Sequence, residues 1–376
     1  MPGRRSRTPN NAGREAQLVD PLIPRYEPGV PAAELERGLG VERLARLDAN
    51  EAWFGPFPQA VVAAQAAAGF AHRYPELGAD LLETLAKRHD VPVGAIALGN
   101  GADALIGLIC AALLRPGDEC VMPDPSYVSY AQDTLRARAT PVAVPVLPDG
   151  RLDLPAMAAA VGPSTRLVYV CNPNNPTGGM CTAAELDAFL DDVPENVVAV
   201  IDEAYAEYID DPDYPNGPAL TRERPNVAVL RTFSKLFGLA GLRIGYVIGP
   251  LWLTDAVSAL RHWYDVSDAA ILAASASLED PEEVTRRQQI TREARTLLVA
   301  ALEEYGLKPL PSVSPFVVFP VDDADGLAEG FLRHAVVVRP YPHANGTFIR
   351  IAVGGEEDLR QVKAALVALS AEGLLI

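Results

Sequence analysis

Short apolar segments alternate with helical patterns between residues 95 and 248, and this alternation constrains the fold more than any other feature of the sequence. The expected strands are 95–98, 119–122, 139–146, 167–171, 197–201, 227–230 and 244–248. Helical patterns lie between several of them, at 104–114, 128–136, 154–161 and 182–189. Strands that alternate with helices form parallel sheets, because each helix returns the chain to the same end of the sheet. The sequence therefore predicts an α/β fold with a mostly parallel mixed sheet and helices on both faces.

Polar residues follow two of the most apolar expected strands. Residues 172–178 read Asn-Pro-Asn-Asn-Pro-Thr-Gly, a rigid and amide-rich turn directly after the strand that ends at residue 171. Asp202 and Tyr205 follow the next strand. Open α/β sheets bind ligands beyond the carboxyl ends of their strands. We therefore expect these side chains to point into one crevice.

The stretch 232–246 places one lysine and one arginine among small and apolar residues. A lysine in such surroundings favours its neutral amine, which can attack a carbonyl and form a Schiff base. Lys235 is therefore a candidate covalent anchor. Thr232, Ser234 and Arg243 supply donors that suit a phosphate. Taken alone, a Ser-Lys pair is more often a turn with a solvated lysine, so the other motifs must decide.

A second phosphate signal is the turn Gly99-Asn100-Gly101-Ala102-Asp103, which leads into an apolar helix. A glycine turn at a helix N-terminus exposes unpaired N–H groups and the positive end of the helix dipole, which together bind phosphate. Asp103 could instead cap the first turn of this helix. Many such turns bind nothing, so this signal alone leaves both interpretations open.

The pattern changes after residue 253, where longer helices alternate with a few strands and predict a smaller α+β domain. Arg339 and Arg350 lie on or beside apolar strands of this part, where an arginine needs a structural carboxylate or a ligand anion as its partner. The expected division is a flexible arm (1–17), an N-terminal segment packing with the small domain (18–45), a large α/β domain (46–260) and the small domain (261–376).

The net charge of −17 argues against a nucleic-acid partner, because phosphate backbones select basic surfaces. No apolar run has the length of a membrane span, so no membrane association is expected. The four cysteines form no Cys-x-x-Cys pair and the five histidines show no metal-ligand spacing. These features predict a cytoplasmic protein without a metal site.

Taken together, the 172–178 turn, Asp202 to Tyr205 and the 232–246 stretch resemble the fold type I pyridoxal-phosphate aminotransferases. Within that group the chain looks like the histidinol-phosphate and aromatic aminotransferases. The resemblance runs from about Tyr26 to the last helix, and three motifs in the same order and spacing rarely agree by chance.

The resemblance implies that pyridoxal 5'-phosphate is held covalently by Lys235, which then carries the proton between the substrate Cα and the cofactor. It implies that Asp202 hydrogen-bonds the pyridine nitrogen and keeps it protonated, so that the ring withdraws electrons. Tyr205 and Asn175 would bond the phenolic oxygen, and Tyr127 would stack on the ring. The phosphate-binding residues implied by the resemblance are Gly101, Ala102, Asp103, Thr232, Ser234 and Arg243, together with Tyr74 of a second subunit in a homodimer.

For the substrate, the resemblance implies that Arg350 binds a carboxylate or phosphate, with Arg339 nearby and Tyr26 closing the site. Asn50 belongs to the same expected set. The sequence departs from the family at 50–53, which read Asn-Glu-Ala-Trp, and at 263–267, which read Trp-Tyr-Asp-Val-Ser. Asp265 would repel a phosphate-bearing substrate unless it faces away.

The expected function is transamination between histidinol phosphate, or an aromatic or imidazole-type amino acid, and a 2-oxo acid such as 2-oxoglutarate. Two alternatives stay open at this point. One is a pyridoxal-phosphate decarboxylase or lyase on the same fold, because the pocket decides which Cα bond is cleaved. The other is a non-catalytic protein that binds the cofactor, against which the full set of motif residues argues.

Overall fold

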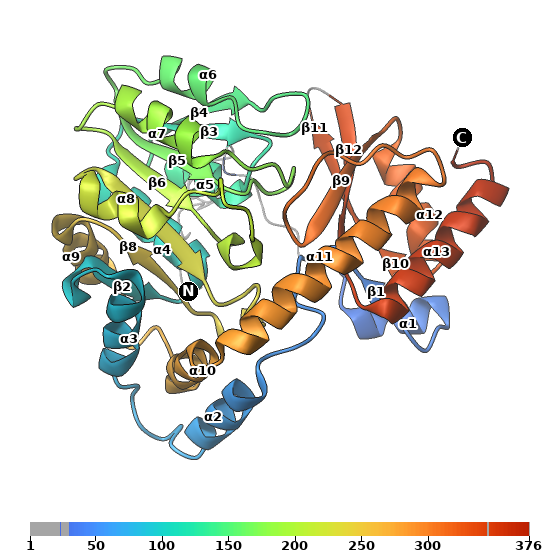
Figure 1. Cartoon of the computed structure of the whole chain (residues 1–376), viewed down its shortest axis with the longest axis horizontal. Coiled ribbons are helices and arrows are strands. Elements are labelled where there is room, and N and C mark those ends of the chain that lie inside the picture. The colour runs from blue at the N-terminus through green and yellow to red at the C-terminus, as the bar shows by residue number, and fades with distance from the viewer. Residues whose placement is uncertain (1–22, 24–29, 344–345, 376) are drawn as a thin grey trace, which may run out of the picture.

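The computed structural model describes residues 23, 30–343 and 346–375. Within this range the chain forms a large α/β domain and a small α+β domain, and the long helix α11 (Pro281–Glu303) passes from one to the other (Figure 1).

The large domain is built on a seven-stranded sheet with the order β2-β8-β7-β6-β5-β3-β4. Six strands run in one direction, and only β8 runs against its neighbours. The mostly parallel mixed sheet expected from the sequence is thus confirmed. The strands are β2 (Ile96–Gly99), β3 (Glu119–Asp124), β4 (Thr140–Pro145), β5 (Thr165–Cys171), β6 (Val198–Asp202), β7 (Val227–Thr232) and β8 (Gly245–Ile248).

Helices cover both faces of this sheet, because alternate residues of each central strand point to opposite sides. In β5, Leu167 and Tyr169 join a core cluster with residues of α4, α5 and α9, whereas Val168 and Val170 join another with residues of α6 and α7. The helices of this domain are α2 (Pro58–Ala68), α3 (Ala79–His89), α4 (Gly101–Leu113), α5 (Val128–Arg136), α6 (Leu154–Ala159), α7 (Ala183–Asp192), α8 (Gly217–Glu223), α9 (Leu251–Leu260) and α10 (Asp268–Leu278).

The small domain contains an antiparallel sheet with the order β11-β12-β9, and its core also holds Leu47 from the N-terminal part of the chain. A separate parallel pair joins β1 to β10. Strand β1 thereby ties residues 45–46 to the C-terminal part of the molecule. The elements are α1 (Ala32–Leu39), β1 (Ala45–Arg46), β9 (Phe316–Val321), α12 (Ala324–Arg333), β10 (Val336–Val337), β11 (Arg339–His343), β12 (Gly346–Ala352) and α13 (Glu356–Ala371).

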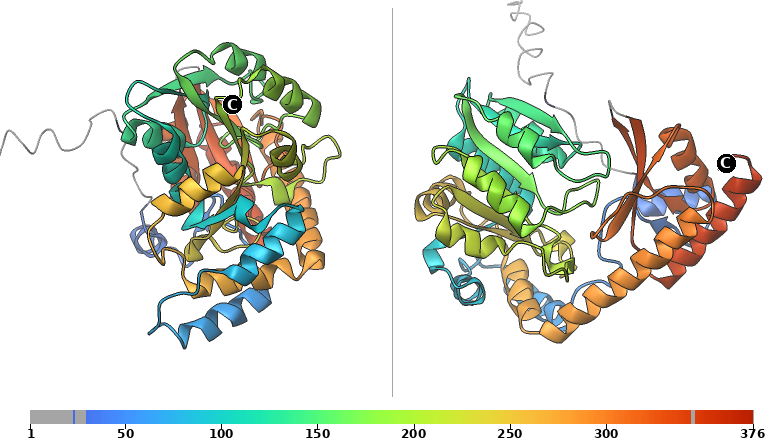
Figure 2. Two further views of the ribbon diagram at one scale, coloured as in Figure 1. Left: turned by 90° about the vertical axis from the view of Figure 1, so that its left-hand side faces the viewer. Right: turned by 45° about the horizontal axis from the view of Figure 1, so that its top comes forward.

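Helix α10 packs on α2 rather than on the small domain, and the two lie side by side in every view (Figures 1 and 2). Its residues Ala270, Ala273 and Ala274 share one hydrophobic cluster with Phe57 and Phe233 of the large domain. The change of pattern near residue 260 marks a loop after which the chain returns to the large domain. We therefore propose a domain boundary inside α11 instead of at residue 261. In the described ranges, no helix combines the length and apolar composition that a membrane crossing requires.

Candidate active site

The sequence motifs converge where the carboxyl ends of β5, β6 and β7 meet, since these strands are parallel neighbours in the sheet. Asn172, Asp202 and Thr232 lie at these three ends. The small domain reaches the same place through Arg350 of β12, whose Nη1 donates to Oδ1 of Asn175 at 2.7 Å. The site therefore lies between the two domains.

Lys235 lies in the loop that follows β7, fixed by the buried side chains of Phe233 and Leu236 on either side. Its Nζ donates to the main-chain oxygen of Asn50 at 3.2 Å and lies 5.6 Å from the ring centroid of Tyr205. Burial, and after it the positive charge of Arg350, lowers the pKa of Lys235 to about 8. Such an amine is neutral far more often at pH 7 than a solvated lysine, as nucleophilic attack requires.

Asp202 is the last residue of β6 and is almost completely buried. The hydroxyl of Tyr130 donates to its Oδ2 at 2.6 Å, and the main-chain N–H of Ala204 donates to its Oδ1 at 3.0 Å. Burial raises the pKa of Asp202 to about 6, although the hydrogen bond from Tyr130 opposes the rise. The carboxylate is thus ionised at neutral pH, but burial destabilises its negative charge. A cationic partner would stabilise that charge.

Tyr130 is a site residue that the sequence analysis missed. It lies on α5 with no exposed surface, and its ring stacks on Tyr169 with a centroid distance of 4.3 Å. Tyr127, which the analysis did select, lies one helical turn earlier and packs edge-on against Tyr130 at 5.8 Å. Two tyrosines at this spacing lie on one face of a helix, and that pattern could have indicated Tyr130.

Tyr205 and Asn50 are joined directly, because Nδ2 of Asn50 donates to the Tyr205 hydroxyl at 3.1 Å. Asn50 is buried and has a backbone φ of 52°, in the left-handed region that asparagine tolerates. Its Oδ1 is buried without a hydrogen-bond partner in the described part of the chain. A buried amide oxygen of this kind is available to a ligand.

Arg350 is only 5% exposed, and its hydrogen-bond acceptors among the described residues are neutral. They are Oδ1 of Asn175 at 2.7 Å, the hydroxyl of Tyr341 at 2.8 Å and the main-chain oxygen of Asp48. Nε of Arg350 is buried and unpartnered in this part of the structure. The structural carboxylate that the sequence analysis considered as its partner is not present among the described residues.

The start of α4 forms a cradle that could hold a phosphate. Within the described residues no side chain caps this helix, so the N–H groups of its first turn are available. Gly101 has a φ of 79°, and a Cβ there would lie 2.5 Å from Nη2 of Arg243. The hydroxyls of Thr232 and Ser234 lie 3.0 Å apart, and Thr232 is opposite Gly245 in the sheet, next to the main-chain nitrogen of Ala102. The arrangement brings backbone donors, two hydroxyls and a guanidinium together, as a phosphate requires.

The carboxylate of Asp103 does not cap α4 but connects the cradle to α5. Its Oδ1 accepts hydrogen bonds from Tyr127 at 2.5 Å and Ser129 at 2.9 Å, and its Oδ2 lies 3.4 Å from Nη2 of Arg243. This carboxylate therefore fixes the hydroxyl end of Tyr127 and the head of Arg243 on the two sides of the cradle.

The other expected residues are Tyr26, Tyr74 and Arg339. Tyr26 lies outside the described residues. Tyr74 is 79% exposed and stacks on Tyr264 with a centroid distance of 4.7 Å, so its expected role depends on a second copy of the chain. Arg339 lies directly opposite Arg350 in the register of β11 and β12.

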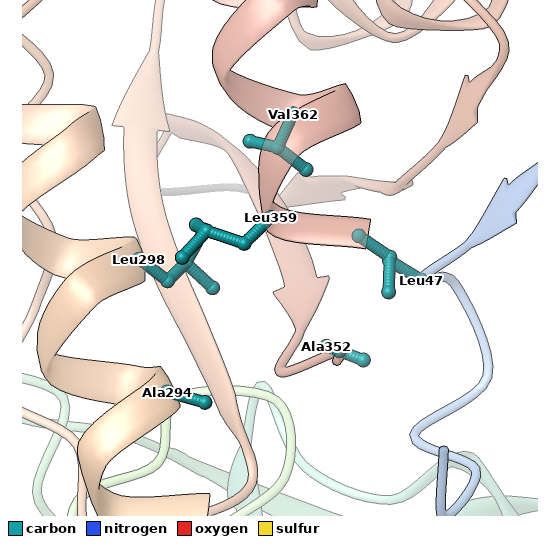
Figure 3. A pocket seen from close by; sticks show the side chains of 7 residues that line it. Leu47, Ala294, Leu298, Ala352, Leu359 and Val362 are labelled. Carbon is teal, nitrogen blue, oxygen red and sulfur yellow. The ribbon is translucent and has the colours of Figure 1, made fainter. Parts of the chain in front are cut away.

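A small cavity elsewhere, between α11, α13 and β12, is lined by side chains that offer no catalytic or ligand-binding polar group (Figure 3). It is lined by Leu47, Ala294, Leu298, Ala352, Gly354, Leu359 and Val362, none of which has a polar side chain. The described residues also contain no group of three His, Cys, Asp or Glu side chains that could hold a metal ion.

Comparison with known proteins adds a consistent set of similarities. The profile of the family "Aminotransferase class I and II" matches residues 42–366. Histidinol-phosphate aminotransferase 2 of Carboxydothermus hydrogenoformans is 40% identical over 333 residues, which are 88% of this chain and 92% of that protein. The aromatic amino acid aminotransferase of Thermobifida fusca is also 40% identical, over 89% of this chain and 92% of that protein.

A solved structure is similar over almost the whole chain. It is histidinol-phosphate aminotransferase from Sinorhizobium meliloti in complex with pyridoxal-5'-phosphate, with a TM-score of 0.85 and 31% identity. The superposition covers 95% of this chain and 98% of that one.

Proposed function

Since this chain belongs to the class I and II aminotransferases and is a pyridoxal-phosphate-dependent enzyme, we propose that its amino donor is histidinol phosphate and its acceptor a 2-oxo acid such as 2-oxoglutarate. Membership of this family favours transamination over the decarboxylase and the non-catalytic alternatives. An aromatic amino acid is the second candidate donor, because a relative of that name is as similar as the histidinol-phosphate enzymes.

The described residues fit pyridoxal phosphate, which when bound withdraws electrons from the substrate Cα and carries the amino group between the two half-reactions. In our proposal Lys235 anchors it, and the ionised carboxylate of Asp202 holds the ring nitrogen. The cradle at the start of α4 binds the phosphate, and the unpartnered oxygen of Asn50 faces a ligand. Asn175 and Tyr205 bond the phenolic oxygen, and Tyr127 stacks on the ring.

Lys235 also moves the proton in this proposal. Its lowered pKa, about 8, lets the amine accept a proton and return it near neutral pH, as general acid–base catalysis requires. The contact with the Asn50 carbonyl holds the amine beside the site at 3.2 Å.

The observation that carries the donor assignment is the buried charge of Arg350. Because its acceptors in the described part of the molecule are neutral, the guanidinium lacks a compensating anion, and a buried cation without one is costly. A donor that brings a phosphate or a carboxylate supplies that anion. Arg339, opposite it in the sheet, adds a second positive charge.

The carboxylate of Asp265, which the sequence suggested would repel a phosphate, is paired inside the protein. Nε of Arg261 lies 3.3 Å from its Oδ1, and Nη1 of Arg261 also donates to the main-chain oxygen of Leu98 at 2.8 Å. This ion pair supports a phosphate-bearing donor, because Arg261 offsets part of the negative charge of Asp265. Burial nevertheless raises the pKa of Asp265, and its Oδ1 accepts no hydrogen bond from the described residues.

The donor is tested by comparing kcat/KM for histidinol phosphate, histidinol and phenylalanine, with 2-oxoglutarate as acceptor. Histidinol lacks only the phosphate, and we expect its kcat/KM to be about 10- to 10²-fold lower, since a lost charged hydrogen-bonded contact costs about 1.5–3 kcal/mol. A higher kcat/KM for phenylalanine than for histidinol phosphate would assign the enzyme to aromatic donors. Release of carbon dioxide without amino transfer would contradict transamination itself.

We further propose a cytoplasmic homodimer with shared sites. The exposed and stacked Tyr74 and Tyr264 provide a surface on which a second copy could place Tyr74 against the neighbouring phosphate cradle. The four cysteines are all buried and unpaired, which supports a reducing compartment.

A further inference from the structure

Arg287 is one of the largest fully buried side chains of the protein, although it lies on the interdomain helix α11. Its Nη1 donates to two main-chain oxygens, those of Gly55 at 2.8 Å and Leu236 at 3.0 Å. Its Nε donates to Glu283 at 2.7 Å, and its guanidinium lies over the rings of Phe54 and Phe57 at 4.3 and 4.0 Å. The side chain is therefore held by three hydrogen bonds and by two aromatic rings.

The two carbonyl groups that Arg287 binds belong to the two loops that meet at the catalytic amine. Leu236 follows Lys235 directly, and Gly55 lies in the loop that carries Asn50. On the other side of this junction Nζ of Lys235 donates to the carbonyl of Asn50. Arg287 and Lys235 therefore connect the same two loops. Lys235 connects them at the site, and Arg287 connects them on the opposite side of the junction.

The two loops also touch without a side chain between them. Gly238 has a φ of 70°, and a Cβ at this position would lie 2.3 Å from the carbonyl oxygen of Gly55. The junction is thus a close approach of two backbones, which only glycine permits. The guanidinium satisfies the carbonyl groups that this approach buries.

Burying an arginine in a core costs desolvation free energy, whereas an apolar side chain of similar size packs there without that cost. Its carboxylate partner within the described ranges is Glu283, which it shares with the exposed Arg286, whose Nε donates to Glu283 at 2.6 Å. The guanidinium donates to both loops from Nη1 while its Nε holds Glu283, and an apolar residue could make none of these three hydrogen bonds.

We propose that Arg287 is a positioning residue for the reaction: it clamps the loop of Asn50 against the loop of Lys235 and so keeps the catalytic amine in its reactive orientation. The inference depends on the proposed role of Lys235. It connects the interdomain helix to the reacting nitrogen through two hydrogen bonds.

The test compares Arg287→Met with Arg286→Met. Both changes remove one charge and one partner of Glu283 from the same helix, but only the first removes the clamp. We expect kcat to fall about 10- to 10²-fold in Arg287→Met with KM for the donor changed less than about 3-fold, since a small misplacement of reacting groups has effects of this size. Arg286→Met should retain both values.

A second measurement uses the protein without cofactor, in which the rate of covalent attachment of pyridoxal phosphate follows the neutral fraction of Lys235. In Arg287→Met the midpoint of this rate against pH should move up, because a loosened loop admits water to the amine. The charged groups around the amine are the same in both variants, namely Arg350, Glu51, Asp103, Arg243 and Asp202. A purely structural role would leave the midpoint in place.

Arg287→Lys keeps the charge but replaces the planar guanidinium, which holds Glu283 through Nε and both loops through Nη1, by a single ammonium group. This variant provides the test if Arg287→Met does not fold. We expect kcat and the midpoint of Arg287→Lys between those of the wild type and those expected for the methionine variant. Unchanged kcat and midpoint in a folded Arg287 variant would overturn the clamp. Failure of the wild-type chain to attach pyridoxal phosphate at Lys235 would instead contradict the proposed function.

Discussion

The hydrogen bond from Tyr130 to Asp202 predicts how strongly the site can hold a protonated ring nitrogen. Replacing Tyr130 by Phe removes one hydroxyl and leaves the ring that stacks on Tyr169. A hydrogen bond to a charged group contributes about 1.5–3 kcal/mol, and one pKa unit corresponds to about 1.4 kcal/mol. The pKa of Asp202, about 6 in the wild type, should therefore rise by roughly 1 to 2 units.

The direction of the effect follows from the charge of the carboxylate. A ring nitrogen that carries a proton binds to the ionised form of Asp202, so the cofactor binds more weakly as pH falls through the pKa of this residue. In the wild type this loss should set in below about pH 6. In Tyr130→Phe it should already be present at pH 7 and disappear above about pH 8.5, as the shift estimated from the lost hydrogen bond implies.

The assay is the dissociation constant of pyridoxal phosphate for the cofactor-free protein between pH 5 and 9. The dissociation constant of the variant is divided by that of the wild type at each pH. This ratio cancels the titrations of the cofactor itself, which affect both proteins equally. Tyr169→Phe is the matched control, because its hydroxyl contacts Ile106 and Cys110 and not Asp202. Parallel pH curves for Tyr130→Phe and wild type would refute the reasoning.

Three further predictions concern the other parts of the site. Lys235→Ala should lower kcat about 10²- to 10⁴-fold, since the variant loses its general acid–base group. It should also abolish covalent attachment of the cofactor, which is measured by visible absorption. A variant with full activity would contradict the role of Lys235 as the anchor. Arg243→Lys should raise the dissociation constant of pyridoxal phosphate roughly 10-fold or more in a fluorescence titration, because a fork of donors becomes a point charge; an equal affinity would remove Arg243 from the phosphate cradle. Co-expressed chains carrying Tyr74→Ala and Lys235→Ala should form mixed dimers with one native site and regain activity that neither variant has alone; no gain in activity would show that Tyr74 does not act across the dimer.

The sequence was sufficient to predict the sheet and the residues at the ends of its strands, because strand periodicity and polar strand ends are local features. Asp202 is the last residue of β6, and Thr232 is the last residue of β7. The spacing of Thr182 and Glu185 is likewise that of a capping box, and both of its hydrogen bonds are present in the structure.

What could not be predicted is the set of partners that meet across the fold. Tyr130 is 72 positions from Asp202, and Arg287 is 232 positions from Gly55. Neither residue stands in a motif. The spacing of Tyr127 and Tyr130 indicates that they share one face of a helix, but it does not indicate that this face meets Asp202. Their roles depend on which helix face meets which strand end, and that is decided by packing rather than by local sequence.

The reversed direction of β8 restricts how many residues can lie between Lys235 and Arg243. Because this strand runs against its neighbours, it begins where the other strands end, and Gly245 lies opposite both Thr232 and Gly99 in the register. A Cβ on Gly245 would lie 2.8 Å from the carbonyl oxygen of Arg231 and 3.1 Å from the nitrogen of Ala102. The number of residues between Lys235 and Arg243 is therefore restricted, because one residue inserted or deleted there would shift either β8 or the anion-binding arginine.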